Sequence, residues 1–187
     1  MKYKLKDLLQ YSRFGVNTKP SETGDTKFLQ LKHFNQQENT LSEVDLFVNL
    51  DNSLSRYLLV NGDILFVTKG HRHLAWCYDE KIGQAVASTI FLILHPNTNI
   101  IHPQFLELYL NMPEVVSYIS DNLVKGSIIS SISKEDLMEL IIDVPQLQIQ
   151  QNLIEITNSH RNQLSLIEQL KNTKKHYYNQ LMISSIS

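Results

Sequence analysis

Residues 126–182 read GSIISSISKEDLMELIIDVPQLQIQQNLIEITNSHRNQLSLIEQLKNTKKHYYNQLM. After Pro145, neither proline nor glycine occurs up to residue 187, so the sequence contains no strong helix breaker there. This stretch predicts a single helix of about nine or ten turns. A helix of that length exposes more surface than a small domain can cover, so we expect it to have a partner.

Large and apolar residues recur along this predicted helix in alternating steps of four and three, which is the spacing of a coiled-coil seam. One row of the seam holds Leu153, His160, Ile167, Lys174 and Leu181, and the other holds Ile149, Ile156, Gln163, Leu170 and Tyr177. The polar members lower the stability of a coiled coil but fix its register and partner choice. The alternative is a helix that packs on its own domain. No other stretch of the chain is as long, so we expect a partner helix from another chain.

Composition limits the class of protein. The chain is 42% hydrophobic and 19% charged, as folded globular proteins are, which argues against disorder. The net charge of -2 argues against a general nucleic-acid coat, so any nucleic-acid binding must rest on a local patch. The single Cys77 excludes an internal disulfide framework and suits a reducing compartment. Without a signal-peptide core or a membrane-length apolar run, we expect a cytoplasmic protein with no membrane partner.

Upstream of Pro145 the pattern mixes strands and helices. We expect one or two helical turns within residues 3–10, and strands at 28–34, 74–78 and 85–94. Residues 57–60 and 63–68 flank Asn61-Gly62, a preferred hairpin turn, and predict a hairpin. Helices are expected at 104–111, from Pro113 to about 124, and at 134–140 behind a Ser133 cap, before an extended run at 141–144. The predicted fold is α+β: a globular domain at 1–144 and a long coiled-coil helix at 145–187.

The densest basic cluster in the chain consists of Lys69, Gly70, His71, Arg72 and His73. It follows a predicted strand and contains a glycine, so we expect an exposed loop. In such a loop arginine can contact guanine with two hydrogen bonds, and lysine can contact phosphate. Further candidate phosphate contacts are Lys27, Lys32 and His33. The alternative is a solvated loop that binds nothing.

Signals for catalysis are weak. His71 and His73 would face the same side of a strand and could contribute to a metal site, but no HExxH or paired CxxC motif accompanies them. Cys77 lies in an apolar setting and is interpreted as a small buried hydrophobe, and Asp63 is interpreted as a turn residue. No phosphate-binding loop or GxSxG motif is present. We therefore predict a binding module that has no catalytic residues and no cofactor.

Three stretches of this sequence resemble the DNA specificity subunit of type I restriction–modification systems. Residues 57–70, YLLVNGDILFVTKG, resemble a family segment that contains Gly-Asp-Ile-Leu and then a basic residue and a glycine. Residues 126–137, GSIISSISKEDL, resemble a run with a glycine, an isoleucine and a leucine at fixed spacing. Residues 141–154, IIDVPQLQIQQNLI, resemble the start of the family's long helix. With residues 3–9 and 28–34, the similarity covers nearly the whole chain.

The resemblance implies a role for each part of the chain. Family members typically carry two target recognition domains that read DNA, each followed by a long helix. The two helices pack antiparallel, separate two half-sites and dock the methyltransferase subunits. This chain, with one globule and one helix, is similar to a half-length, non-catalytic specificity subunit. As a homodimer it would read a bipartite inverted repeat. The implied partners are double-stranded DNA, the methyltransferase (modification) subunit and, as a further candidate, the restriction subunit.

Some residues depart from the family pattern, and two other functions stay open. Residues 147–151 read LQIQQ where a Glu-Gln pair is common in the family, and polar residues interrupt the seam. One alternative is a regulatory paralogue that binds the methyltransferase without reading DNA. The other is a small metal-dependent enzyme built around His71 and His73.

Overall fold

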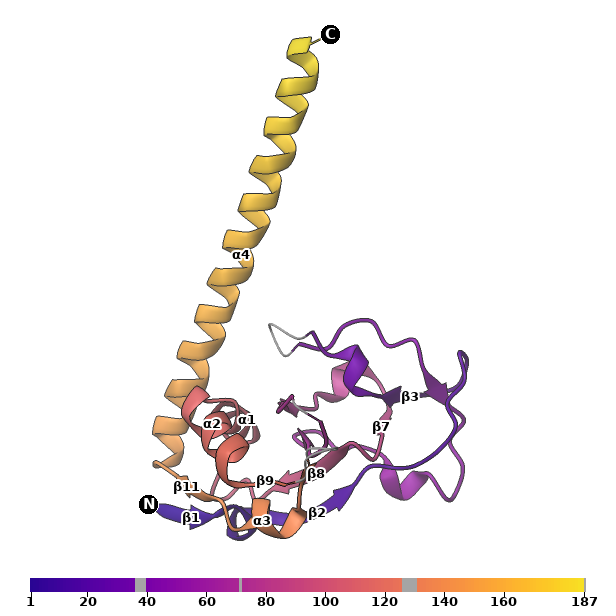
Figure 1. The fold of residues 1–187 in the computed structure, drawn as a ribbon, viewed down its shortest axis with the longest axis vertical. Helices are drawn as coiled ribbons and strands as arrows, with labels where there is room; N and C mark the ends of the chain where they lie inside the picture. The colour runs from indigo at the N-terminus through magenta and orange to yellow at the C-terminus, as the bar shows by residue number, and fades with distance from the viewer. Residues whose placement is uncertain (36–39, 71, 126–130, 187) are drawn as a thin grey trace. The chain divides into compact units, whose positions relative to one another are not determined.

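The computed structural model describes residues 1–35, 40–70, 72–125 and 131–186. The chain divides into two compact units, Met1–Gln150 and Gln151–Ser187. The first unit contains sheets and short helices, and the second is the body of one long helix (Figure 1). The fold is therefore α+β with a long C-terminal helix. Of the helices in the described residues, none combines the length and apolar character needed to cross a membrane.

A four-stranded antiparallel sheet lies at the centre of the first unit. Its order is β2 (Leu9–Phe14), β8 (Phe91–Pro96), β5 (Ile64–Val67) and β6 (Ala75–Cys77). In the central register Leu65 of β5 lies opposite Ile93 of β8 and Trp76 of β6. Every residue of β5 is buried, which explains why its sequence is a continuous apolar run and not an alternation.

A second sheet of three strands has the order β4 (Phe47–Val48), β3 (Thr26–Leu29) and β7 (Ala85–Ala87), with β3 and β7 parallel. Phe34 connects this region to the central sheet. Its buried ring packs edge-on against Trp76 and Phe91, with centroids 5.3 and 5.6 Å away. The core therefore forms between the sheets, around aromatic and branched aliphatic side chains.

A short helix, α1 (Pro103–Leu110), packs against the edge strand β6 of the central sheet, and a second short helix, α2 (Pro113–Asn122), packs against α1. Each of these helices begins with proline, whose fixed φ suits the first helical position. At the end of α1, the Asn111 side chain accepts from the Ala75 N–H at 3.1 Å and donates to the Ala75 carbonyl at 2.7 Å. These bonds satisfy backbone groups of β6, which is an edge strand of the sheet formed by the described residues.

Two small antiparallel pairs complete the first unit: β1 (Lys2–Lys4) with β11 (Ile141–Asp143), and β9 (Val124–Lys125) with β10 (Ser131–Ile132). Helix α3 (Lys134–Met138) lies between β10 and β11 in the chain, and the Ser133 hydroxyl caps it by accepting from the Asp136 N–H at 3.0 Å. Helix α4 (Leu147–Ile186) follows β11. Near its start, the buried Gln150 side chain accepts from the His102 N–H and donates to the Ile100 and Pro145 carbonyls.

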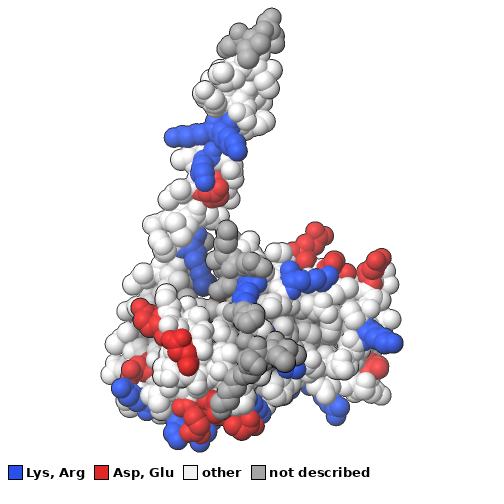
Figure 2. All heavy atoms as spheres, viewed as in Figure 1, with Lys and Arg blue, Asp and Glu red and all other residues white. Residues whose placement is uncertain are grey.

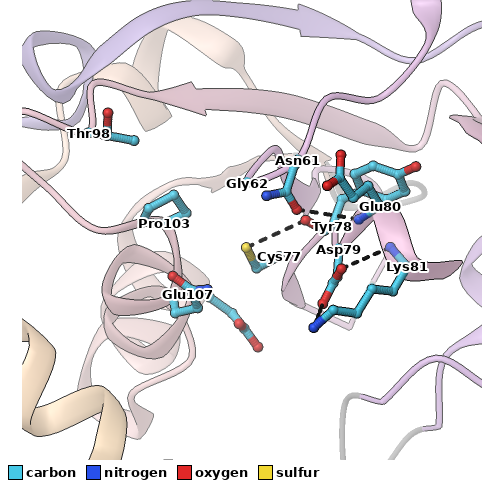
Figure 3. A pocket seen from close by; sticks show the side chains of 11 residues that line it. Asn61, Gly62, Cys77, Tyr78, Asp79, Glu80, Lys81, Thr98, Pro103 and Glu107 are labelled. Atoms are coloured by element: carbon cyan, nitrogen blue, oxygen red, sulfur yellow. Dashed lines mark hydrogen bonds and ion pairs between the residues drawn. The ribbon is translucent and has the colours of Figure 1, made fainter.

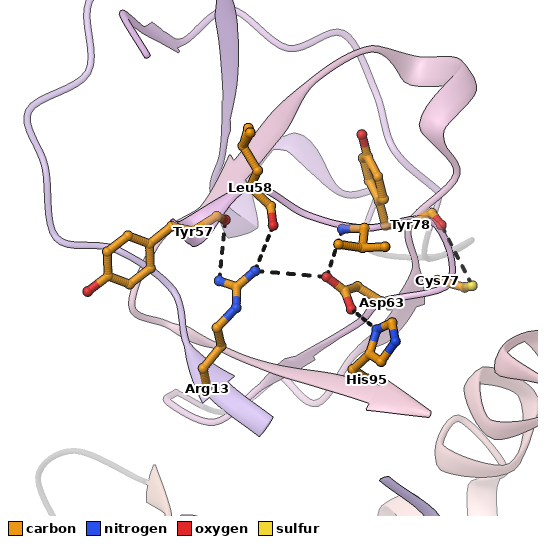
Figure 4. A network of polar contacts seen from close by, with 8 residues as sticks. Arg13, Tyr57, Leu58, Asp63, Cys77, Tyr78 and His95 are labelled. Atoms are coloured by element: carbon orange, nitrogen blue, oxygen red, sulfur yellow. Dashed lines mark hydrogen bonds and ion pairs between the residues drawn. The ribbon is translucent and has the colours of Figure 1, made fainter. Parts of the chain in front are cut away.

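A buried carboxylate fixes the turn that precedes β5 (Figure 4). Asp63 is fully buried, accepts from the Val60 N–H at 2.9 Å and bonds His95 Nδ1 at 2.8 Å. Arg13 Nη2 lies 3.9 Å from its second oxygen, and the same guanidinium donates to the carbonyls of Tyr57 and Leu58. The interpretation of Asp63 as a turn residue is confirmed.

The structure confirms the helices predicted at 104–111, from Pro113 and behind Ser133, the extended run before Pro145 and the long helix. It corrects the predicted hairpin at 57–68. Residues 58–60 form no strand, because Arg13 and Asp63 bond their backbone, and β5 pairs instead with β6 and β8.

Three other expectations need smaller corrections. The strand predicted at 28–34 ends at Leu29, since the His33 ring accepts from the Gln30 N–H and closes a 3-10 turn at Leu31–His33. The strand predicted at 85–94 is two strands, β7 and β8, separated by a turn. Within residues 3–10 the helical turn is 3-10 and covers only Leu5–Leu8, between β1 and β2.

Candidate nucleic-acid interface

The basic loop of residues 69–73 connects β5 to β6 at one end of the central sheet. Lys69 is exposed, and Gly70 has a φ of 96°, a conformation that favours glycine over other residues. Arg72 and His73 are half-buried, and His71 lies outside the described residues. The loop is therefore a surface feature, but Arg72 and His73 are not fully available to solvent.

Two segments distant in sequence flank this loop. On one side Arg72 donates from Nη1 to the Phe34 carbonyl at 2.9 Å and from Nη2 to the Asn35 carbonyl at 2.5 Å. On the other side Lys69 forms an antiparallel bridge with Ser131 of β10, and the Ile132 N–H donates to the Thr68 carbonyl at 2.9 Å. Residues near 34, 70 and 131 therefore meet at one end of the sheet, and we call this region the convergence site.

The three other candidate phosphate contacts are bonded within the protein. Lys27 Nζ donates to the Ile82 carbonyl at 2.5 Å, and Lys32 Nζ lies 2.8 Å from an Asp45 oxygen. The His33 ring is buried. Its Nδ1 accepts a hydrogen bond from the Gln30 N–H, and its Nε2 lies 2.7 Å from an Asp45 oxygen. Hydrogen bonds from Lys32 and His33 lower the pKa of Asp45 to about 2. These side chains hold the segment that leads to Phe34, and their predicted contact with DNA remains a prediction.

Charge is mixed on the face of the first unit that Figure 2 shows. Figure 2 shows basic and acidic side chains interspersed over the face in view. Such a surface agrees with the net charge of -2 and gives little long-range attraction to a polyanion. Any specific contact to DNA would therefore depend on local geometry more than on bulk charge.

A cavity of about 550 Å³ lies near the opposite end of β5 and β6, between residues 61–62, residues 77–81 and the start of α1 (Figure 3). Cys77 lines it, and burial, with a smaller contribution from nearby carboxylates that include Glu107, raises the pKa of its thiol to about 12. A thiol with that pKa is almost entirely protonated at neutral pH, so it is a poor nucleophile. Among the residues that the structure describes, no group of three His, Cys, Asp or Glu side chains could hold a metal ion.

The seam residues of α4 all lie on its exposed surface. Ile156 is 64% exposed, Ile167 60% and Tyr177 62%. The seam therefore forms an exposed apolar stripe, interrupted by His160, Gln163 and Lys174, and exposed apolar surface of this kind is typical of a protein–protein interface. The stripe is the second candidate functional surface of the chain.

Sequence reasoning identified the basic loop and the apolar stripe but missed the partners of the loop. The stretch before Phe34 looked like a plain strand, and no local signal connects it to Arg72, which lies 38 residues away from Phe34. The contacts of the buried Asp63 with Arg13 and His95 were also missed. The only local signal was the Gly-Asp pair at residues 62–63, which identified a turn but not its distant partners.

Comparisons with known proteins agree on one family. A family model described as "Type I restriction modification DNA specificity domain" matches residues 1–175. The structure is similar to the crystal structure of the HsdS subunit from Thermoanaerobacter tengcongensis, with a TM-score of 0.68 and 12% identity over 91% of this chain and 44% of that one. It is also similar to the type I restriction-modification system S subunit from M. genitalium, with a TM-score of 0.57 and 14% identity over 88% of this chain and 40% of that one.

A third solved structure is described as "Structural basis underlying complex assembly and conformational transition of the type I R-M system". Its TM-score is 0.62, with 14% identity over 97% of this chain and 43% of that one. The chain thus spans less than half the length of each of these three proteins. At such low identities the likeness shows a shared fold. A search of curated proteins found no match.

Proposed function

Because the chain belongs to the type I restriction modification DNA specificity domain family, we propose that it recognises a specific DNA sequence for a type I restriction–modification complex. The observation that carries this proposal is the family match over residues 1–175, which includes the whole sheet-containing unit and most of α4. In this proposal the chain is non-catalytic, and methylation and cleavage belong to partner subunits. A methyltransferase subunit is the first expected partner, and a restriction subunit is a further candidate.

The convergence site is the proposed DNA-reading surface of the first unit. It presents exposed Lys69 between the Phe34–Asn35 backbone and the β9–β10 pair, all at one end of a rigid sheet. Surface loops held by a buried sheet are a common arrangement for binding, because the scaffold fixes their position while their sequence varies. Lys69 is suited to a phosphate contact, and its neighbours to reading the half-site.

The chain is further proposed to act as a homodimer through α4. Its seam residues form an exposed apolar stripe. The chain has one globular unit, and the matched structures have chains more than twice as long. A second copy would supply both a covering helix and a second reading unit. A two-fold dimer presents the same surface twice, so the expected site is an inverted repeat of two half-sites.

The test combines oligomeric state with unbiased site selection. The purified full chain would first be sized by light scattering, which should give twice the monomer mass. Bound sequences would then be selected from random double-stranded DNA, with and without a type I methyltransferase subunit from the same cells. Enrichment of an inverted repeat at constant spacing supports the proposal. Stable binding of the methyltransferase with no enriched sequence would instead identify the regulatory paralogue.

A further inference from the structure

The Arg72 guanidinium donates hydrogen bonds to backbone carbonyls at the convergence site. Its two terminal nitrogens donate to consecutive carbonyls, those of Phe34 and Asn35. A planar guanidinium presents its N–H groups in a fixed fork, so one arginine can hold two neighbouring acceptors in a defined geometry. Desolvation also lowers the pKa of Arg72, as expected for a group that faces protein on one side.

The carbonyls that Arg72 holds belong to the base of a hairpin, which we define as residues 33–35 and 40–42. Phe34 forms an antiparallel bridge with Leu41, and the Asn35 N–H donates to the Thr40 carbonyl at 2.9 Å. The Ser42 N–H donates to the His33 carbonyl at 2.7 Å. The backbone of the hairpin base is therefore ordered by its own ladder.

The hairpin base is attached to the rest of the unit in two ways. The Phe34 ring is buried against aromatic side chains of the central sheet. The Phe34 carbonyl, on the same residue, is held by Arg72 from the β5–β6 loop. The ring fixes where the hairpin leaves the core, and the guanidinium fixes its distance from the loop that carries Lys69.

We propose that Arg72 is a positioning residue for DNA recognition, which holds the hairpin base at a fixed spacing from the Lys69 loop and does not itself read a base. This inference rests on the proposed function, because the spacing has meaning only if both segments face DNA. The expectation was that Arg72 contacts guanine directly. In this proposal Arg72 instead bonds the Phe34 and Asn35 carbonyls and affects DNA recognition only by holding the hairpin base in place.

Two substitutions separate positioning from a phosphate contact, and the exchange measurement below separates it from a guanine contact, which would also need the arginine fork. Arg72→Lys keeps the charge but loses the fork, so a positioning role predicts that it behaves like Arg72→Ala. A phosphate contact predicts instead that it behaves like the wild type. Lys69→Ala is the matched control in the same loop, since an exposed lysine that binds phosphate should weaken all DNA equally and lower the slope of log K against log salt by about 0.9.

The first measurement needs no DNA. Amide hydrogen exchange of the free protein reports the hairpin base at Asn35 and Ser42, whose N–H groups are bonded across it. We expect both Arg72 variants to lower protection at these amides at least tenfold, with Lys69→Ala unchanged. A thermal melt confirms that each variant is folded. Unchanged protection in both Arg72 variants would overturn the anchoring role, whether or not the chain binds DNA.

The second measurement is binding to the selected site and to random DNA over a range of salt concentrations. We expect both Arg72 variants to lose at least tenfold in affinity for the selected site, to bind random DNA within twofold of wild type, and to keep the wild-type salt slope. A loss shared equally by both DNAs with a lower slope would show a phosphate contact and overturn the proposal. If the wild type selects no DNA while the exchange result holds, the proposed function fails and the anchoring role stands.

Discussion

The apolar stripe of α4 gives a quantitative prediction for the homodimer. Ile167 belongs to the seam and is 60% exposed, whereas Ile183 is 68% exposed and lies roughly 160° further around the helix. The two residues offer the same side chain at nearly equal exposure on opposite faces. The matched pair is therefore Ile167→Gln and Ile183→Gln, which keep a good helix former at each position.

The magnitude follows from the exposed fraction. Full burial of an isoleucine side chain stabilises by about 1.5–3 kcal/mol, so covering the exposed part of Ile167 contributes about 1–2 kcal/mol. A two-fold dimer uses each position twice, so Ile167→Gln should cost the dimer about 2–4 kcal/mol. Since each 1.4 kcal/mol is a factor of ten, the dimer Kd should rise about 30- to 1,000-fold. Ile183→Gln should change it by less than about threefold.

Sedimentation equilibrium over a dilution series measures these dissociation constants, and circular dichroism checks that both variants stay helical. Equal weakening by both substitutions would mean that the effect arises from helix stability and not from the seam. An unchanged Kd for Ile167→Gln, or a wild type that is monomeric throughout, would refute the assignment of the stripe to a second copy.

Three further predictions concern single residues of the first unit. Asp63→Ala should lower the free energy of unfolding by about 3–5 kcal/mol in urea titrations, because the Val60 N–H and His95 Nδ1 each lose their bond to a buried carboxylate; a loss below about 1 kcal/mol would contradict this. Iodoacetamide should alkylate Cys77 at least about 100-fold faster in urea-unfolded than in native protein at pH 8, since burial raises its pKa to about 12; equal rates would show an accessible thiol. Hydrogen bonds from two lysines lower the pKa of Glu139 from 4.5 to about 2, so its contribution to stability is present above pH 4.5 and is lost as pH falls towards 2. The difference in urea midpoint between wild type and Glu139→Gln should therefore exist at pH 7 and shrink steadily below pH 4.5, and a difference independent of pH would contradict that assignment.

The convergence site shows how far sequence reasoning reached. The basic composition of residues 69–73 and their place after a strand predicted a surface loop, and the structure puts Lys69 on the surface. The same composition gave no way to know that the Arg72 fork holds two carbonyls near residue 34. His33 was a plausible phosphate contact by residue type, yet its ring is buried between Gln30 and Asp45. Residue type indicates what a side chain can bind, while its neighbours decide what it does bind.

The sequence by itself determined the features that depend on neighbours within a few residues. The uninterrupted run after Pro145 specified α4, Pro113 specified a helix start, and Ser133 specified a cap. Helical hydrogen bonds and caps join residues three or four positions apart, so their signals are local.

Only the tertiary structure decided which strands pair and which loops meet. β5 had an apolar sequence that suited several partners, and it paired with β6 and β8 because Arg13 and Asp63 bonded the backbone of the expected partner. Arg72 likewise donates to the carbonyls of Asn35 and Phe34, which are 37 and 38 residues away in the sequence. A strand pattern records which face is buried but not which strand lies beside it, so contacts between distant segments are fixed only when the core assembles.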